Sequence, residues 1–356
     1  MKHLILAINP GSTSTKVALF ENEREVFKES IDHPQEVIES FAGLLAQIPM
    51  RREAVFRTLT THGYQPEDLA IIIGRGGLFP PIKTGGYRVN VRMLNMILNE
   101  EMPAHASNLG AVIAQDMAFM AGSEVKAYIY DGESSGDLPE IATITGLKEV
   151  KRQGLCHVLN GRRVAARYSE SLGKRYEELN LIVAHLGGGI TMSVHEKGKI
   201  VDSLSDENGP YFSPERAGTL PSLDLIALCY SGKYTKDELK RKIRGLGGLR
   251  DLLGTSDGRE IARRVESGDE GAVQAMQALA YQIAKGIGQL APVLKGHCDG
   301  IILTGGLAHN QALIADVKTY VDFMAPIAVM PGEYEMEALA LGGLRILRKE
   351  EDVHEF

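Results

Sequence analysis

The chain has 356 residues, with 44% hydrophobic and 24% charged residues, 39 glycines and a formal net charge of -7. The acidic balance argues against a nucleic-acid partner, because phosphate backbones are bound through excess Lys and Arg, and no stretch approaches the run of about 18 apolar residues that a membrane span needs. The length allows two or three domains, each with its own core.

The cysteines and the first residues indicate a cytoplasmic protein. Cys156, Cys229 and Cys298 are odd in number and lack metal-binding spacing, so we expect buried thiols in a reducing compartment. The first predicted strand begins within three residues of the amino terminus, which leaves no room for a signal peptide.

The first predicted hairpin carries many hydrogen-bond donors in its turn. The buried strand HLILA (3–7) leads into INPGSTSTK (8–16), and a second strand that turns at Glu21 to Glu25 follows over 16–27. Glycine permits close backbone approach, and the hydroxyl, amide and lysine donors suit a phosphate chain. The Walker spacing is absent. On this stretch alone, an ordinary Ser/Thr-rich hairpin turn remains the alternative.

Strands alternate with helices further along the chain, which indicates an α/β protein. LAIIIGRGGLF (69–79) and VKAYIYDG (125–132) are typical of strands that end in glycine-rich turns, and residues 105–122 predict a helix that ends at Gly122. In the second half we expect a long helix over 273–294, a strand over 299–306 and a last helix over 335–352 whose charged end extends into solvent.

A second hairpin over 179–203 is similar to the first. When LILA (4–7) is laid over LIVA (181–184), Gly11 meets Gly188, Ser14 meets Thr191 and Val17 meets Val194. The match predicts two similar halves whose hairpin turns point into one shared cleft, and a chance likeness of two apolar hairpins is the alternative. No low-complexity linker separates the halves, so a short hinge near residue 145 is expected.

Seven motifs together resemble, in this order, the butyrate kinases, a branch of the acetate kinases within the actin and sugar kinase superfamily. They are GRGGLFPPIKTGGYRVN (74–90), MPAHASNLGAVIA (102–114), CHVLNGRRVAARY (156–168), GPYFSPERAGTLP (209–221), GGLRDLLGTSDGRE (247–260), TGGLAHNQAL (304–313) and MPGEYEMEALALGGLRIL (330–347). The resemblance implies two duplicated actin-like (ribonuclease H-like) domains with an interdomain cleft. These would be residues 1–145, completed by the helix at 336–356, and residues 146–335, the nucleotide-binding and oligomerisation domain.

The activity implied by the resemblance is reversible phosphoryl transfer between ATP and a short carboxylic acid, giving ADP and an acyl phosphate, with Mg²⁺ as cofactor. The partners implied are the small carboxylate and its acyl phosphate, together with further copies of the chain in a homodimer or larger assembly. A guanidinium can hold a carboxylate or phosphoryl group in a two-pronged fork that lysine cannot make. The catalytic residues implied are Arg75, Asp131, His157, His185 and Arg216, and His105 with Arg75 would bind the acyl substrate.

The nucleotide and metal sites are also implied by the resemblance. The nucleotide-binding positions are Ser12, Ser14, Lys16, Gly187, Gly188, Gly189, Asp257, Arg259, Gly306, Leu307 and Asn310. Mg²⁺ prefers oxygen ligands and keeps several waters. We therefore expect Asn9, Asp131 and a glutamate of GEYEME to approach it directly or through water, with Glu337 chosen and Glu333 or Glu335 as alternatives.

Two departures from the family pattern concern specificity. Gly188 stands where acetate kinases carry asparagine, and butyrate kinases commonly have glycine there. Residues 132–137, GESSGD, replace the proline and valines that usually follow the aspartate in butyrate kinases. This polar run either lines the acyl pocket or faces solvent. Alternatives to a butyrate kinase are therefore a branched-chain or aromatic carboxylate kinase on the same scaffold, or an actin-like ATPase that is not a kinase.

Overall fold

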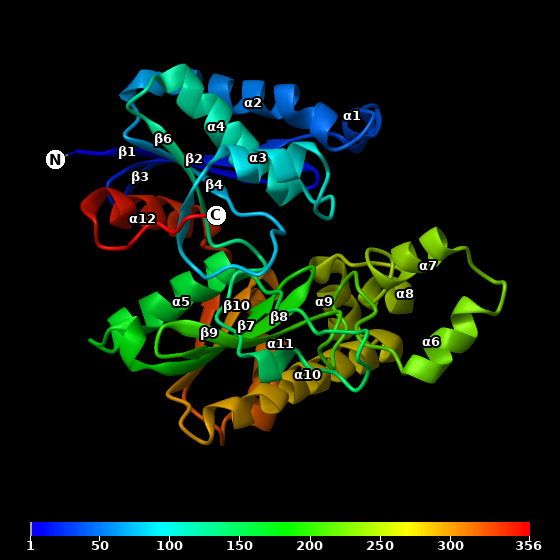
Figure 1. The fold of residues 1–356 in the computed structure, drawn as a ribbon. Coiled ribbons are helices and arrows are strands. Elements are labelled where there is room, and N and C mark those ends of the chain that lie inside the picture. Colours follow the sequence, from blue (N-terminus) through cyan, green and yellow to red (C-terminus); the bar gives the residue numbers. More distant parts are fainter. Residues whose placement is uncertain (1) are drawn as a thin grey trace. The chain divides into compact units, whose positions relative to one another are not determined.

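The two apolar runs that open the predicted hairpins lie in two separate mixed sheets. LILA is part of β1 (Leu4–Pro10) and LIVA is part of β7 (Asn180–Leu186) (Figure 1). In the first sheet the strand order is β3 (Arg24–Asp32), β2 (Ser14–Glu21), β1, β4 (Ile71–Arg75), β6 (Lys126–Tyr130) and β5 (Gly86–Arg88). In the second sheet it is β11 (Ile327–Pro331), β10 (Gly300–Gly305), β7, β8 (Ile190–Glu196) and β9 (Lys199–Ser205). Strands β1, β2 and β3 are antiparallel neighbours, and so are β7, β8 and β9. In the first sheet β4 and β6 run parallel to β1, and β5 is antiparallel to β6; in the second sheet β10 and β11 run parallel to β7. The prediction of two similar α/β halves is confirmed.

The computed structural model describes residues 2–356 and divides them into two units. Unit 1 holds the residues up to Ser135 together with Val158–Arg163 and Tyr334–Phe356, and unit 2 holds Gly136–His157 and Val164–Glu333. Helix α5 (Val158–Ser171) contributes to both. The predicted boundary between residues 145 and 146 stays a prediction.

The remaining elements of unit 1 alternate between strands and helices. They are β2 (Ser14–Glu21), β3 (Arg24–Asp32), α1 (Gln35–Glu39), η1 (Leu45–Gln47), α2 (Ile48–Thr61), η2 (Pro66–Asp68), β4 (Ile71–Arg75), β5 (Gly86–Arg88), α3 (Val91–Leu98), η3 (Ala106–Asn108), α4 (Leu109–Ala121), β6 (Lys126–Tyr130) and α12 (Glu335–Arg348).

Unit 2 has its helices mainly after its first three strands. Its remaining elements are η4 (Glu140–Thr143), η5 (Tyr176–Glu178), β8 (Ile190–Glu196), β9 (Lys199–Ser205), α6 (Ser222–Cys229), α7 (Lys236–Ile243), α8 (Leu249–Leu253), α9 (Gly258–Glu266), α10 (Glu270–Leu290), η6 (Ala291–Leu294), β10 (Gly300–Gly305), η7 (Gly306–His309), α11 (Gln311–Val321) and β11 (Ile327–Pro331). No helix among residues 2–356 is long and apolar enough to cross a membrane.

The sheet of unit 1 has a hydrophobic core on each face, because successive side chains of a strand point to opposite sides. Leu6 and Ile8 of β1 pack into the core that α2 and α4 cover, whereas Ile5 and Ala7 pack into the core that α12 covers (Figure 1). Helix α4 ends at Gly122, whose φ of 99° is one that glycine adopts without strain, so this predicted helix end is confirmed. The packing fixes the carboxyl ends of β1 and β4.

The residue-by-residue overlay of the two hairpins is wrong. Ile8 pairs with Val17 in the first hairpin, and the overlay equates them with His185 and Val194. In the second hairpin His185 pairs instead with Thr191. The reason is that the second pair of strands closes at Leu186 and Ile190 around a shorter turn, so one constant offset cannot fit both strands.

The charged end of the last helix is exposed at Arg348, Lys349 and Glu350, as expected, but the residues that follow return to unit 1. The His354 amide donates to the carbonyl of Gly86 at 2.9 Å, and the Phe356 ring meets the Phe79 ring edge-on at 5.0 Å. The aromatic end residue supplies apolar area, which is buried against the core of unit 1 beyond the charged run. This segment therefore packs beside β5.

Candidate functional site

Arg75 lies at the end of β4 and contacts polar side chains from three other segments of unit 1. Its Nη1 lies 3.2 Å from Asn9 Oδ1 and 3.3 Å from Glu335 Oε2, and its Nη2 donates to Glu133 Oε1 at 2.9 Å. Asn9 Nδ2 also donates to Glu335 Oε2 at 2.6 Å. The Arg75 side chain is only 13% exposed. A guanidinium is therefore held in one orientation beside several oxygen atoms.

Glu335, rather than the chosen Glu337, lies beside Asn9. Glu337 forms an ion pair with Arg163 at 2.9 Å instead. The two glutamates are two positions apart on α12, and residues at that spacing on a helix do not share a face. Within residues 2–356 no group of three or more His, Cys, Asp or Glu is arranged to hold a metal ion. An Asn9–Glu335 pair still fits Mg²⁺, because both offer oxygen atoms and this ion keeps several waters.

Asp131 is buried and faces Arg162 and the Gly85 backbone. Arg162 Nη1 lies 2.6 and 2.7 Å from the two carboxylate oxygens, and the Gly85 amide donates to Oδ1 at 2.7 Å. Burial raises the pKa of the Asp131 carboxyl above its usual value, and Arg162 partly offsets this effect. Its φ of 44° lies in the left-handed region, where Asp and Asn are enriched. Its carboxylate thus joins the end of β6 by a hydrogen bond to the loop before β5.

His105 and Asn108 lie on the loop that leads into α4. His105 Nδ1 is 2.7 Å from Ser107 Oγ and 3.8 Å from Glu133 Oε1, so His105 joins the group around Arg75. The Asn108 amide is used within the loop, since its Oδ1 accepts from Leu78 N at 2.9 Å and its Nδ2 donates to Pro103 O at 2.8 Å. Asn108 therefore holds the backbone that presents His105.

The donor-rich turn after β1 is organised by a residue that sequence reasoning missed. Arg51 of α2 is fully buried and donates to the backbone carbonyls of Gly11, Ser12 and Ser14 at 2.9 to 3.0 Å. Burial lowers its pKa, but a guanidinium stays charged in proteins. Ser12 is exposed, Ser14 is half-buried and Lys16 lies opposite Asn9 in the hairpin. The carbonyls thus point toward Arg51, and a buried positive charge lies beneath the turn.

In unit 2, two predicted histidines stack on each other. The rings of His157 and His185 are 3.8 Å apart and inclined by 8°. His157 Nδ1 lies 2.8 Å from Thr191 Oγ1, and this threonine is the register partner of His185. The bond fixes the orientation of the His157 ring.

Arg216 lies over the glycine turn between β7 and β8. Its Nη1 donates to the buried Asp206 at 2.6 Å, and a Cβ added to Gly189 would lie 2.4 Å from that nitrogen. Only glycine at position 189 permits this approach. Ser213 Oγ donates to the Gly188 carbonyl at 2.8 Å, and Gly187 N donates to Gly189 O at 3.1 Å. The predicted Gly187–Gly189 turn and Arg216 therefore form one group.

The other predicted nucleotide residues of unit 2 begin helices. Asp257 is the N-cap of α9 and accepts from the amides of Arg259 and Glu260, and these bonds lower the pKa of its carboxyl. Asp257 and Arg259 are exposed. Gly306 and Leu307 lie in η7, and Asn310 is the N-cap of α11 through a bond from Leu313 N at 3.0 Å. Within residues 2–356, no side-chain hydrogen bond or ion pair joins these residues to Arg216, and their role stays a prediction.

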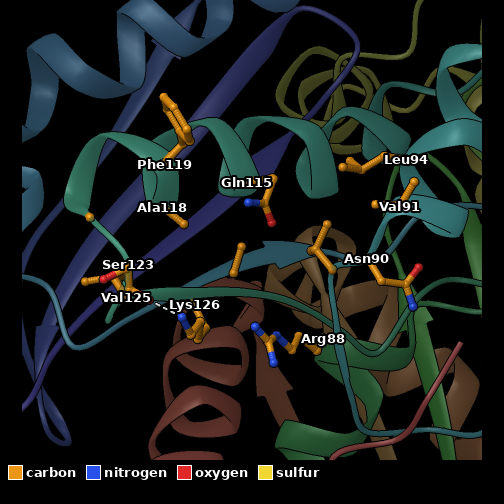
Figure 2. Close-up of a pocket in the computed structure, with 13 residues that line it drawn as sticks. Arg88, Asn90, Val91, Leu94, Gln115, Ala118, Phe119, Ser123, Val125 and Lys126 are labelled. Atoms are coloured by element: carbon orange, nitrogen blue, oxygen red, sulfur yellow. Dashed lines mark hydrogen bonds between the residues drawn. The ribbon is translucent and has the colours of Figure 1, made fainter.

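A cavity of about 490 Å³ in unit 1 lies apart from the predicted residues (Figure 2). Arg88 and Lys126 are its charged lining residues, and Val91, Leu94 and Phe119 supply apolar area. None of the residues predicted for catalysis, nucleotide or metal lines this cavity.

Comparisons with known proteins agree with this architecture. The model of the acetokinase family matches residues 100–328. The fold is similar to that of acetate kinase from Porphyromonas gingivalis (TM-score 0.78, 21% identity, covering 97% of this chain and 100% of that one). It is also similar to acetate kinase from Entamoeba histolytica (0.76, 15%, 98% and 99%) and to propionate kinase from Francisella tularensis (0.72, 17%, 95% and 98%). At these identities the structural likeness shows a shared two-domain actin-like fold.

Proposed function

The chain belongs to the acetokinase family, and we propose that it is a kinase for butyrate or a similar short-chain carboxylic acid. Family membership makes it a carboxylate kinase, which exchanges a phosphoryl group between ATP and a short-chain carboxylate. The observation that carries the proposal within the structure is the oriented Arg75 guanidinium, 2.9 Å from Glu133 and 3.3 Å from Glu335. A fork so held is suited to carboxylate and phosphoryl oxygens.

The reaction needs positioned charge more than proton transfer. A carboxylate oxygen of the acid attacks the γ-phosphorus of ATP, and the bond from that phosphorus to the β,γ-bridging oxygen breaks as ADP leaves. Charge spreads over the equatorial oxygens of the transferred group, where fixed positive groups stabilise it. A short fatty acid has a carboxyl pKa near the value of about 4.3 for Glu, so no proton has to be removed from it at neutral pH.

We assign this stabilisation to Arg75 and Arg216, each oriented by a carboxylate of its own unit. His157 and His185 add hydrogen-bond donors for the transferred group, and the 2.8 Å bond to Thr191 supports this by fixing the ring of His157. Asp131 acts as a positioning residue, because both of its oxygens already accept hydrogen bonds.

We propose that ATP or ADP binds with Mg²⁺, which would be held by Asn9 and Glu335 and would supply charge neutralisation for the phosphates. Glu335→Gln should raise the Mg²⁺ concentration needed for half-maximal turnover several-fold. Glu337→Gln is the matched control, because Glu337 pairs with Arg163. A larger shift for Glu337→Gln would assign the metal to that residue instead.

Self-association is proposed from the apolar residues that α6 exposes. Leu223 of α6 is 81% exposed, Tyr230 at the C-cap of α6 is 88% exposed, and α6 itself has no buried residue in the described chain. Exposed apolar patches of this kind are typical of protein interfaces. We therefore propose a homodimer or larger homo-oligomer.

The experiment that tests the proposed function is ADP release from ATP and Mg²⁺ with and without butyrate. A carboxylate kinase should release ADP only when the acid is present. An ATPase of the same fold would release it at the same rate in both cases, and that result would contradict the proposal.

A further inference from the structure

The carboxylate of Glu133 already binds one end of the Arg75 guanidinium. Glu133 Oε1 accepts from Arg75 Nη2 at 2.9 Å, while Arg75 Nη1 faces Asn9 and Glu335. Glu133 Oε1 also lies 3.8 Å from His105 Nδ1. Two carboxylates of unit 1 therefore share the guanidinium that the family resemblance assigns to binding the acyl substrate.

The backbone holds Glu133 in this place. Ser134 Oγ donates to the Phe79 carbonyl at 2.7 Å, and Ser135 N donates to the Gly132 carbonyl at 2.9 Å. Gly132 packs so closely on Gly76 that a Cβ added to Gly76 would lie 2.6 Å from it. The segment on both sides of Glu133 is therefore fixed against the loop that follows Arg75.

The fixed carboxylate of Glu133 disfavours binding of an acid that carries no hydrogen-bond donor. An ionised carboxylate only accepts hydrogen bonds, and like charges within a few ångströms repel. Among the hydrogen bonds within residues 2–356, Glu133 accepts through Oε1 and not through Oε2, and the side chain is 22% exposed. Glu133 thus offers an acceptor that an alkyl chain cannot use, but that a hydroxyl or ammonium group on the substrate could.

We propose that the preferred substrate is a short carboxylic acid with a hydroxyl or ammonium substituent on carbon 2 or 3, which donates to Glu133 while the acid carboxylate binds Arg75. This inference rests on the proposed function and narrows its substrate class. A hydrogen bond to a charged group corresponds to about 10- to 150-fold in an equilibrium constant. It outweighs the roughly 4-fold effect of one buried methylene.

The test compares kcat/KM for butyrate with kcat/KM for 2-hydroxybutyrate, 3-hydroxybutyrate and 2-aminobutyrate. We expect the wild-type protein to favour at least one substituted acid over butyrate by about 10-fold or more. Glu133→Ala should bring that ratio close to one, and Glu133→Gln, which keeps an acceptor oxygen, should leave an intermediate ratio. Glu67→Ala, which removes an exposed carboxylate of η2, is the control and should keep the wild-type ratio. Thermal melts establish that the variants fold.

Two results would overturn the inference while leaving the carboxylate kinase intact. One is a wild-type protein that uses butyrate as well as or better than every substituted acid. The other is a ratio that is unchanged in both Glu133 variants. Absence of turnover with all four acids would overturn the proposed function and this inference with it, so the two failures are distinguishable.

Discussion

Arg75 and Arg216 are each held by a carboxylate of their own unit, at 2.9 Å from Glu133 and 2.6 Å from Asp206. Replacing either arginine by lysine keeps the charge but removes the planar fork. We expect normal folding by circular dichroism and a fall in turnover of about 10² to 10³, the value typical of a lost oxyanion donor. Arg52→Lys, at a weaker 3.4 Å ion pair with Asp116, should keep its activity. Near wild-type turnover of the Arg75 and Arg216 variants would remove both arginines from the site.

Asp131 is expected to matter for stability. Asp131→Asn suits the left-handed backbone and can still accept from Gly85, but it removes the negative charge from the buried ion pair with Arg162. Breaking a buried ion pair in this way should lower the free energy of unfolding by about 3 kcal/mol, near the low end of the usual range because Arg162 keeps some exposure. Urea denaturation measures this free energy of unfolding. Asp116→Asn, at a more exposed ion pair, is the comparison and should lower the free energy of unfolding by at most about 1 kcal/mol. Equal losses for the two variants would contradict the account.

Some residues could be predicted from sequence, whereas their partners could not. Arg75, His105, His157, His185 and Arg216 follow from the motifs that resemble the family, and the structure places them in two groups, one in each unit. Arg51 could not be found, because the carbonyls it binds are 37 to 40 residues away in the sequence. The choice between Glu335 and Glu337 depends on which face α12 turns toward Asn9, and the sequence of α12 alone does not contain that information.

At the scale of elements, the turn between β7 and β8 offers a sharp test. A methyl group at Gly189 would lie 2.4 Å from Arg216, whereas one at Gly188 would find its nearest atom, on Glu215, at 3.8 Å. We expect Gly189→Ala to displace the guanidinium and reduce kcat/KM by about 10², since small misplacements of catalytic groups have effects of that size. Gly188→Ala keeps its amide and should lose much less. Equal losses in steady-state kinetics would show that Arg216 does not depend on this close approach.

Most of the buried strands could be predicted from the sequence, because each of them is an apolar run bounded by glycine. β1, β4, β6, β7 and β10 lie where such runs occur, and α4 ends at its predicted glycine. The overlay of the two hairpins failed because turn length, which sets the register, is not visible in the apolar pattern. The packing of Phe356 was missed because the charged residues before it dominate the local composition.

At the scale of the whole molecule, two units with equivalent sheets carry two separate groups of charged and polar side chains. Unit 1 holds Arg75 among Asn9, Glu335, Glu133 and His105, and unit 2 holds Arg216 and the histidine pair beside a glycine turn. The proposed reaction requires both groups, so replacing either arginine should lower acid-dependent turnover by about 10² to 10³ even though each unit keeps its fold.

Acyl phosphate formed from ATP and a carboxylic acid, trapped with hydroxylamine as the hydroxamate, is the measurement that tests the central claim most directly. Two methylenes separate butyrate from acetate and contribute about 1.6 kcal/mol, or some 15-fold. We predict one hydroxamate per ADP, with propionate, butyrate and isobutyrate within about tenfold of one another and acetate poorer. ADP formation without hydroxamate would contradict the assignment as a carboxylate kinase, and acetate as the best unsubstituted acid would contradict the predicted preference for butyrate over acetate.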